Sequence, residues 1–177
     1  MCNQEKGKNK FTEVKTFSVP FRLEEINDNL SINTNTLFEL SKEQIIHKAF
    51  KFHSQGKIKE AVKYYQHFYN QGFNDHRVFS NYGVILKSFG KLEEAELITR
   101  KAIEINPDFP DAQSNLGGIL RDLGKLEEAE LSTRKAIELN PNFSDAYSNL
   151  GNILRDLGEL EEAELSTRKA IELNPNF

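Results

Sequence analysis

The chain has almost none of the residues that hold small domains together covalently or through metals. Among its 177 residues there is one cysteine, Cys2, and no tryptophan. A single cysteine excludes an internal disulfide framework and any zinc site built from cysteines, and it is typical of a reducing compartment. We therefore expect a cytoplasmic protein.

The chain also lacks a basic charge excess and any long hydrophobic run. Its 23 Lys and Arg residues are outnumbered by 27 Asp and Glu residues, and the net charge is -4. Without a basic surface to neutralise phosphates, nucleic acid and anionic membranes are poor partners. No apolar run reaches the roughly 18 residues that cross a bilayer, and the residues after Cys2 are too polar for the apolar core of a signal peptide.

What the chain does have is a repeat of 34 residues. Residues 110–143 and 144–177 are identical at 30 of 34 positions, and residues 76–109 match the next block at 22 positions in the same frame. The last two blocks differ only at these pairs: Pro110/Ser144, Gln113/Tyr147, Gly118/Asn152 and Lys125/Glu159. A period this strict predicts stacked supersecondary units.

Each block has the pattern of two helices. In the last block, apolar residues recur from Ala146 to Leu157 with the spacing of one helix face. Gly158 interrupts this pattern, and a second helix is predicted from about Leu160 to Leu173. Pro175 ends that helix, since proline lacks the backbone N–H and clashes with the preceding turn. The predicted inward residues of the second helix are Leu160, Ala163, Thr167, Ala170, Ile171 and Leu173.

Small residues recur where the two helices of a block must touch. A glycine in the middle of a helix costs about 1 kcal/mol relative to alanine, so its repetition predicts a close backbone approach. These positions are Gly83, Gly117 and Gly151 in the first helices and Ala95, Ala129 and Ala163 in the second helices.

These residues resemble the signature of the tetratricopeptide repeat. In the last block the matching residues are Tyr147, Leu150, Gly151, Leu154, Ala163, Thr167 and Pro175. No block has the tryptophan of the signature, and threonine replaces its second-helix aromatic. The resemblance implies an all-α protein, a right-handed α-solenoid of four 34-residue helix-turn-helix repeats after an irregular N-terminal segment. The predicted parts are residues 1–41 (irregular), 42–75 (a degenerate first repeat), 76–109, 110–143 and 144–177.

The start of the array carries two further signals. Ser41 followed by Gln44 predicts a capping box for the first helix. The stretch from Phe17 to Leu23 is apolar enough to dock on the array. Within the degenerate repeat, Phe68 stands where the later blocks have alanine.

The resemblance also implies that the first helices line a concave groove. One polar residue recurs there, in the row Asn81, Asn115 and Asn149. A carboxamide has both donors and an acceptor, so it can pair with the backbone of an extended peptide whatever its side chains are. The row resembles the asparagine ladder in the repeat arms of O-linked N-acetylglucosamine transferases, although asparagine is frequent at this place in tetratricopeptide proteins of many functions.

A second row on the groove side is basic, with Lys87, Arg121 and Arg155. It could pair with acidic side chains of a ligand, or the neighbouring Asp122 and Asp156 could neutralise it. The full set of predicted groove residues is Asn81, Asn115, Asn149, Lys87, Arg121, Arg155 and Asn152.

No motif points to catalysis. The sequence has no nucleophile elbow and no glycine-rich phosphate loop, and its four histidines lack the spacing of a metal site. We therefore expect no catalytic residue, no metal and no other cofactor.

Three functions remain open. The leading hypothesis is a protein-protein interaction scaffold that binds an extended peptide segment in the concave groove. The alternative is a substrate-presenting repeat arm of, or partner to, a glycosyltransferase or sulfotransferase, with this chain a truncated form. Residues 164–175 resemble the repeat regions of marine cyanobacterial proteins, some of which continue into such enzymes. The third is a repeat array with little selected function.

The last block poses a separate question, because each repeat leaves an apolar side for its neighbour. No further helix follows the last one in the sequence. End-to-end self-association through this C-terminal helix, a different partner, or the remainder of a longer protein would each cover it.

Overall fold

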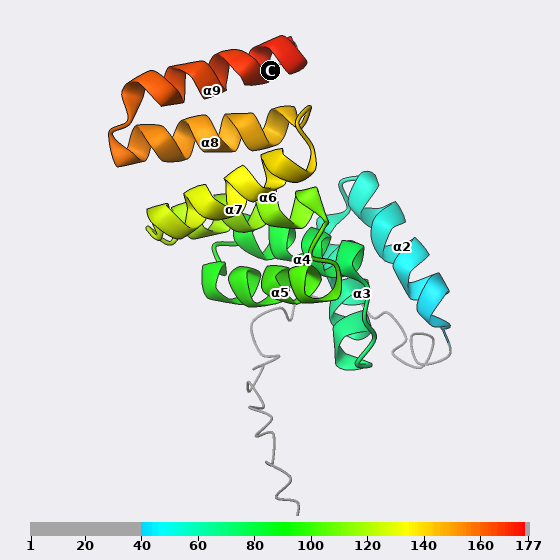
Figure 1. Cartoon of the computed structure of the whole chain (residues 1–177). Helices are drawn as coiled ribbons and strands as arrows, with labels where there is room; N and C mark the ends of the chain where they lie inside the picture. The colour runs from blue at the N-terminus through cyan, green and yellow to red at the C-terminus, as the bar shows by residue number, and fades with distance from the viewer. Residues whose placement is uncertain (1–39, 176–177) are drawn as a thin grey trace, which may run out of the picture. The chain divides into compact units, whose positions relative to one another are not determined.

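The helices predicted from the 34-residue period are present throughout the described part of the chain. The computed structural model describes residues 40–175, which lie within one compact unit. This part contains eight helices and no strand (Figure 1). Their bounds are α2 (Lys42–Ser54), α3 (Ile58–Asn70), α4 (His76–Ser88), α5 (Leu92–Ile105), α6 (Pro110–Asp122), α7 (Leu126–Leu139), α8 (Ser144–Leu157) and α9 (Leu160–Leu173). None of these helices is long and apolar enough to span a membrane.

Glycine and proline set the ends of the helices. Gly158 follows α8 with a φ of 87°, a left-handed conformation that costs little only for a residue without a Cβ. It turns the chain from α8 into α9. The second helix ends at Leu173, as predicted, two residues before Pro175.

The two helices of each regular hairpin approach closely at the predicted glycines. A Cβ added at Gly117 would overlap the hydroxyl of Thr133 and lie 3.1 Å from the carbonyl oxygen of Ala129. The corresponding distances to a carbonyl oxygen are 3.4 Å at Gly83 and 3.2 Å at Gly151. The Thr133 hydroxyl donates to the Ala129 carbonyl over 2.8 Å. The close backbone approach is therefore confirmed, and the threonine that replaces the aromatic of the signature fills the space beside the glycine.

Each hairpin packs on the next through both of its helices. α4 packs on α6 and α6 on α8, while α5 and α7 each pack on the first helix that follows (Figure 1). One isoleucine anchors the last junction: Ile153 is fully buried with Leu116, Leu120 and Ala129 of the preceding repeat. Because the first helices are in mutual contact, they lie on the inner side of the solenoid.

The first hairpin, α2 and α3, has an aromatic core. Phe68 is fully buried, and its ring centroid lies 5.5 Å from that of Phe73 and 5.9 Å from that of Phe79. Tyr65 stacks on Tyr82 with the centroids 5.7 Å apart. The contacts of Phe68 with Phe79 and of Tyr65 with Tyr82 join α3 of the first hairpin to α4 of the second.

Most of the predicted irregular segment, residues 1–41, lies outside the described residues, as does the predicted docking stretch at residues 17–23. Of that segment only Leu40 and Ser41 are described. The predicted capping box is confirmed, because the Gln44 N–H donates to Ser41 Oγ and the Ser41 N–H donates to Gln44 Oε1.

The prediction of the inward residues of α9 is partly wrong. Leu160 is 65% exposed, Ile171 is 52% exposed, and Thr167 is exposed as well. Their counterparts on α7 are at least partly buried. The difference arises because α8 packs on α7, whereas no residue within 40–175 packs on the outer side of α9.

The contact at Gly117 predicts a loss of stability when a methyl group is added. Gly117→Ala forces the new Cβ against Thr133, and overpacking of this kind costs about 1–3 kcal/mol. Gly118→Ala is the matched control, because its Cβ would meet only the ends of the Lys87 and Asn149 side chains. The control gains up to about 1 kcal/mol of helix propensity. The urea midpoint, followed by circular dichroism, should fall only for Gly117→Ala, and equal midpoints would contradict the close contact.

Candidate functional site

The predicted asparagine row lies on the first helices and is bonded from repeat to repeat. Asn115 on α6 donates through Nδ2 to Ser80 Oγ on α4 over 2.9 Å. Asn149 on α8 donates to Ser114 on α6, with Nδ2 3.0 Å from Oγ and 3.4 Å from the backbone oxygen. Both serines are buried. Each bond therefore fixes a carboxamide against the preceding helix.

The first member of the row is held differently, because Ile46 stands where the later repeats have serine. Asn81 instead hydrogen-bonds to the side chain of Tyr65 on α3, and this bond partly offsets the burial that raises the pKa of Tyr65 far above its ordinary value. His53 Nδ1 lies 3.1 Å from the same hydroxyl, and burial lowers the pKa of His53. A row that is uniform in the sequence thus has two kinds of anchor.

The carboxamide oxygens of Asn115 and Asn149 accept no hydrogen bond from any residue within 40–175. Both residues are half-buried, and their NH2 groups are tied to the serines. The acceptor end of each carboxamide is therefore held in a fixed orientation and has no partner among the described residues. The serines were missed in the sequence analysis, although the pair Ser-Asn recurs in every regular block.

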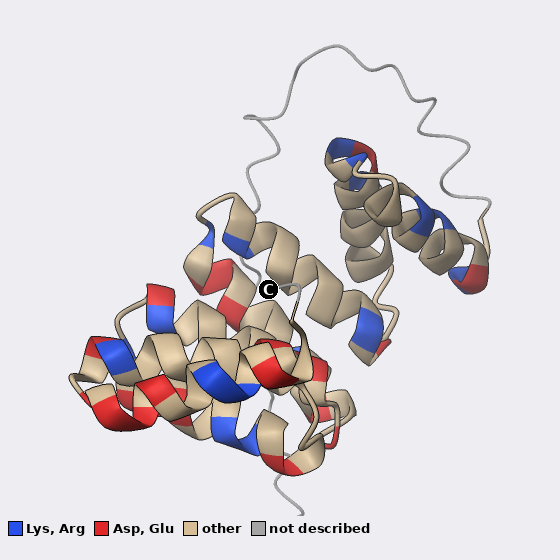
Figure 2. Ribbon diagram, turned by 90° about the horizontal axis from the view of Figure 1, so that it is seen from above, with Lys and Arg blue, Asp and Glu red and all other residues tan. Residues whose placement is uncertain are grey.

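Two of the three cations in the predicted basic row pair with aspartates of the following repeat. Lys87 Nζ lies 3.4 Å from Asp122 Oδ2, and Arg121 Nε lies 2.6 Å from Asp156 Oδ2. These pairs confirm the interpretation that the aspartates balance the row. Figure 2 shows positive and negative residues interspersed along the helices.

Arg155 differs from the other two cations of the row. Its side chain is 61% exposed, against 31% for Arg121. The carboxylate beside it, Asp156, is 3.9 Å away and already pairs with Arg121. Arg155 therefore has the weakest anionic contact of the three within the described residues.

A third row changes from repeat to repeat. Its members, 34 residues apart, are Phe50, Val84, Gly118 and Asn152. Val84 is exposed and Asn152 is half-buried. A Cβ at Gly118 would lie 3.0 Å from Lys87 Nζ and 3.9 Å from Asn149 Nδ2. The asparagine row, the basic row and this variable row therefore meet at Gly118.

Comparison with known proteins assigns the chain to a family. Family models described as tetratricopeptide repeat match residues 76–109, 110–143 and 144–177, which together make up more than half of the chain. The chain belongs to the tetratricopeptide repeat family, whose members are generally non-catalytic scaffolds for protein interactions. Comparison with curated proteins found no match.

Solved structures of tetratricopeptide repeat proteins share the fold. YrrB, described as having an unusual peptide-binding site, is 22% identical, with a TM-score of 0.66 over 77% of this chain and 70% of YrrB. MamA is 21% identical, with a TM-score of 0.67 over 76% of this chain and 79% of MamA. The first repeat domain of Spaghetti (RPAP3), bound to the HSP90 peptide SRMEEVD, is 29% identical, with a TM-score of 0.55 over 58% and 81% of the two chains. The described part of the chain is an all-α solenoid of helix-turn-helix repeats.

The bond between Asn149 and Ser114 predicts a measurable coupling. Asn149→Ala and Ser114→Ala each remove the bond, and a double-mutant cycle of urea unfolding should give a coupling of about 0.5–1.5 kcal/mol, the usual net value of one hydrogen bond. Ser148→Ala is the matched control, because no asparagine within the described residues bonds to Ser148. It should change the free energy of unfolding by less than about 0.5 kcal/mol. A coupling of zero would show that the serine does not fix the carboxamide.

Proposed function

We propose that the chain is a protein-interaction scaffold that holds an extended peptide segment along α4, α6 and α8 and that has no catalytic activity of its own. The hairpin of α2 and α3 serves as a divergent first repeat. The observation that carries the proposal is the pair of fixed carboxamide oxygens at Asn115 and Asn149. Acceptors that are oriented in advance lose little freedom when the N–H groups of a ligand bind.

The spacing of the asparagine row suits an extended chain. Packed helices lie roughly 8–10 Å apart, so Asn81, Asn115 and Asn149 span about 20 Å. An extended peptide advances about 3.3 Å per residue, and roughly six residues would cover the row. Backbone N–H groups are the same in nearly every peptide residue, so this mode of binding tolerates different side chains.

The charge pairs of the groove argue against an acidic ligand. Lys87 and Arg121 already face Asp122 and Asp156, so a ligand carboxylate would have to displace an aspartate. The exposed side chain of Val84 offers an apolar contact instead. We therefore expect a segment of low net charge, whose affinity depends only weakly on salt.

Two of the similar proteins support peptide binding as the function. YrrB is described by its peptide-binding site, and the structure of the first repeat domain of RPAP3 contains a bound peptide. That peptide, SRMEEVD, is rich in acidic residues. The groove of this chain differs, because Lys87 and Arg121 already pair with aspartates. We therefore expect its ligand to carry fewer acidic residues than SRMEEVD.

A library of random seven-residue peptides, selected on the unmodified chain, tests the proposal. Peptides bound through the row should lose about tenfold or more in affinity for the variant Asn115→Ala/Asn149→Ala, which corresponds to two lost hydrogen bonds of ordinary net strength. Fluorescence anisotropy of labelled peptides measures the affinity. Selection of no peptide, or only of peptides that bind both proteins equally, would overturn the proposal.

The matched control for this experiment is the variant Ser80→Ala/Ser114→Ala. It releases the same two carboxamides from the preceding helices but keeps their oxygens. It should therefore lose less affinity than the asparagine variant, because it gives up the orientation of the oxygens but not the oxygens themselves. Equal losses in the two variants would mean that affinity follows the stability of the array rather than the carboxamide oxygens.

A further inference from the structure

Asn81, the first asparagine of the row, is linked to a histidine through a buried tyrosine. Asn81 on α4 hydrogen-bonds to Tyr65 on α3, and His53 Nδ1 on α2 lies 3.1 Å from the same Tyr65 hydroxyl. Tyr65 is fully buried, so water does not reach this hydroxyl. We call the three side chains the His53–Tyr65–Asn81 network. It connects α2 to the asparagine row.

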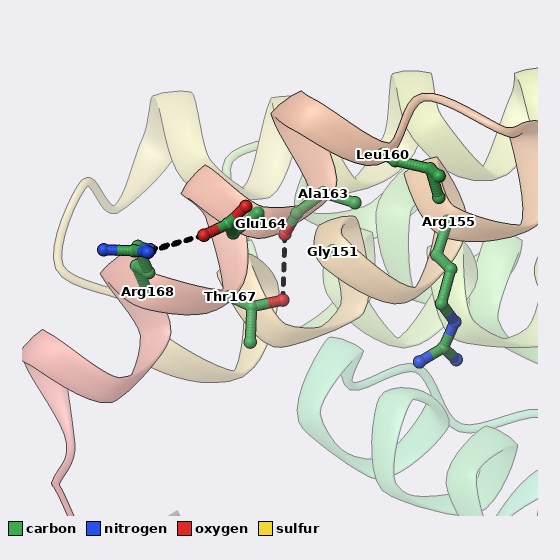
Figure 3. Close-up of a pocket in the computed structure, with 7 residues that line it drawn as sticks. All are labelled: Gly151, Arg155, Leu160, Ala163, Glu164, Thr167 and Arg168. Carbon is green, nitrogen blue, oxygen red and sulfur yellow. Dashed lines mark hydrogen bonds and ion pairs between the residues drawn. The ribbon is translucent and has the colours of Figure 1, made fainter.

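The network depends on residues that the first repeat alone carries. Threonine occupies the register of Tyr65 in the three later repeats, and lysine or arginine occupies the register of His53. Figure 3 shows both counterparts in the last repeat: Thr167 donates to the carbonyl of Ala163 on its own helix over 2.9 Å, and Arg155 extends away from it. A threonine side chain is also much shorter than that of tyrosine. The tyrosine of the first repeat is therefore what reaches the asparagine of the next one.

Packing holds the ring of Tyr65 in place. It stacks on Tyr82 with the centroids 5.7 Å apart, and the His53 ring meets it edge-on with the centroids 6.0 Å apart. Phe50 lies on it with the centroids 6.3 Å apart. Because the ring is fixed, its oxygen stays between His53 and Asn81. Only the hydroxyl proton can change direction.

With His53 neutral, the network has one direction. The Tyr65 hydroxyl has a single proton, which it donates to the unprotonated Nδ1 of His53, and the NH2 group of Asn81 donates to the Tyr65 oxygen. A donor at that oxygen stabilises the phenolate. Accordingly, burial raises the pKa of Tyr65, and the bond from Asn81 opposes this rise. The carboxamide oxygen of Asn81 then has the same role as those of Asn115 and Asn149.

Protonation of His53 reverses the direction. An imidazolium has an N–H at both ring nitrogens, so Nδ1 can only donate to Tyr65. The Tyr65 proton then has one acceptor left in the network, the carboxamide oxygen of Asn81. A buried hydroxyl without an acceptor is costly, so the carboxamide turns and its NH2 group takes the place of its oxygen.

We propose that His53 determines which group the first position of the groove offers to a ligand. With His53 neutral, Asn81 offers an acceptor and the ligand segment must supply an N–H. With His53 protonated, Asn81 offers a donor and the segment must supply a carbonyl oxygen. The consequence for binding rests on the proposed peptide groove, whereas the turn of Asn81 does not. His53 is a positioning residue that acts through Tyr65.

No carboxylate within residues 40–175 holds His53 in its protonated form. In the later repeats the cation of this register pairs with an aspartate of the next repeat, as Lys87 does with Asp122. For His53 that aspartate register holds Ser88, whose hydroxyl donates to the Ile85 carbonyl over 2.7 Å. Burial lowers the pKa of His53, and no carboxylate contributes to the shift.

The other charged groups around His53 are cations. Arg77 on α4 lies over the Phe50 ring of α2, and it already pairs with Asp75 over 2.8 Å. His53 is also in the last turn of α2, where the helix dipole favours a cation. Protonation is therefore within reach on mild acidification, below about pH 6.5. The charged or titratable groups on the surrounding elements are Lys51 on α2, Lys57 in the loop after it, Tyr65 on α3, and Arg77 and Lys87 on α4.

A pH titration of the unmodified chain, followed by NMR on isotope-labelled protein, tests the turn of Asn81 without a ligand. Between about pH 8 and about pH 5, the side-chain NH2 signals of Asn81 should shift with the same midpoint as the ring nitrogens of His53. Asn115 is the internal reference, because it bonds to Ser80 and should not follow that midpoint.

Two substitutions separate the network from a general effect of pH. His53→Gln keeps an acceptor for the Tyr65 hydroxyl but does not titrate, so the Asn81 signals should stay constant. Tyr65→Phe leaves the titration of His53 in place and removes the link, so Asn81 should no longer follow it. The proposal is wrong if the Asn81 signals do not shift in the unmodified chain, or if they shift equally in both variants.

Peptide affinity is the second readout. A peptide selected from the seven-residue library at about pH 8 should lose about threefold or more in affinity at about pH 5, because one hydrogen bond of the row is lost. Its affinity for His53→Gln should not fall. If Asn81 turns but the affinity is equal at both pH values, His53 does not set the specificity of the groove. If the library yields no peptide, the peptide groove is wrong, and the titration still decides the turn of Asn81.

Discussion

The close approach of the two helices in each regular hairpin is the constraint on which the array depends. Without side chains at Gly83, Gly117 and Gly151, the helices come close enough for a threonine hydroxyl to lie beside each glycine. The pair then presents one surface, on which the first helix of the next repeat packs. Because three hairpins repeat this contact, their polar residues fall into rows along the first helices.

The helix bounds and the contact within each hairpin could be predicted from the sequence, because they depend on residues close together in one block. The contacts between blocks could not. Arg121 is adjacent to Asp122 in the sequence, yet it pairs with Asp156, which is 35 residues further on. Similarly, nothing within one block shows that Asn149 donates to Ser114. The exposure of Ile171 depends on whether a neighbour packs on α9, which the pattern of a single block does not contain.

In the proposed mode of binding, the fold and the ligand share the side chains of the asparagine row. The NH2 groups of Asn115 and Asn149 stabilise the stack, and their oxygens remain for binding. A carboxamide free at both ends could satisfy more ligand groups, but it would lose more conformational freedom on binding. Lys87 and Arg121 likewise pair with aspartates of the following repeat. In the proposed mode of binding, selectivity would depend on the row of Phe50, Val84, Gly118 and Asn152, which differs in every repeat.

The hydrogen bonds and ion pairs that recur at successive junctions join residues at a constant offset in the chain. The offset is 35 residues from Ser114 to Asn149 and 28 residues from Arg134 to Glu162. A gene that gains or loses one 34-residue block in frame therefore rebuilds these contacts at once, without compensating substitutions. The length of the array can change in a single genetic event, and with it the length of peptide that the proposed groove would accommodate. The last repeat of each descendant would inherit the same outer surface.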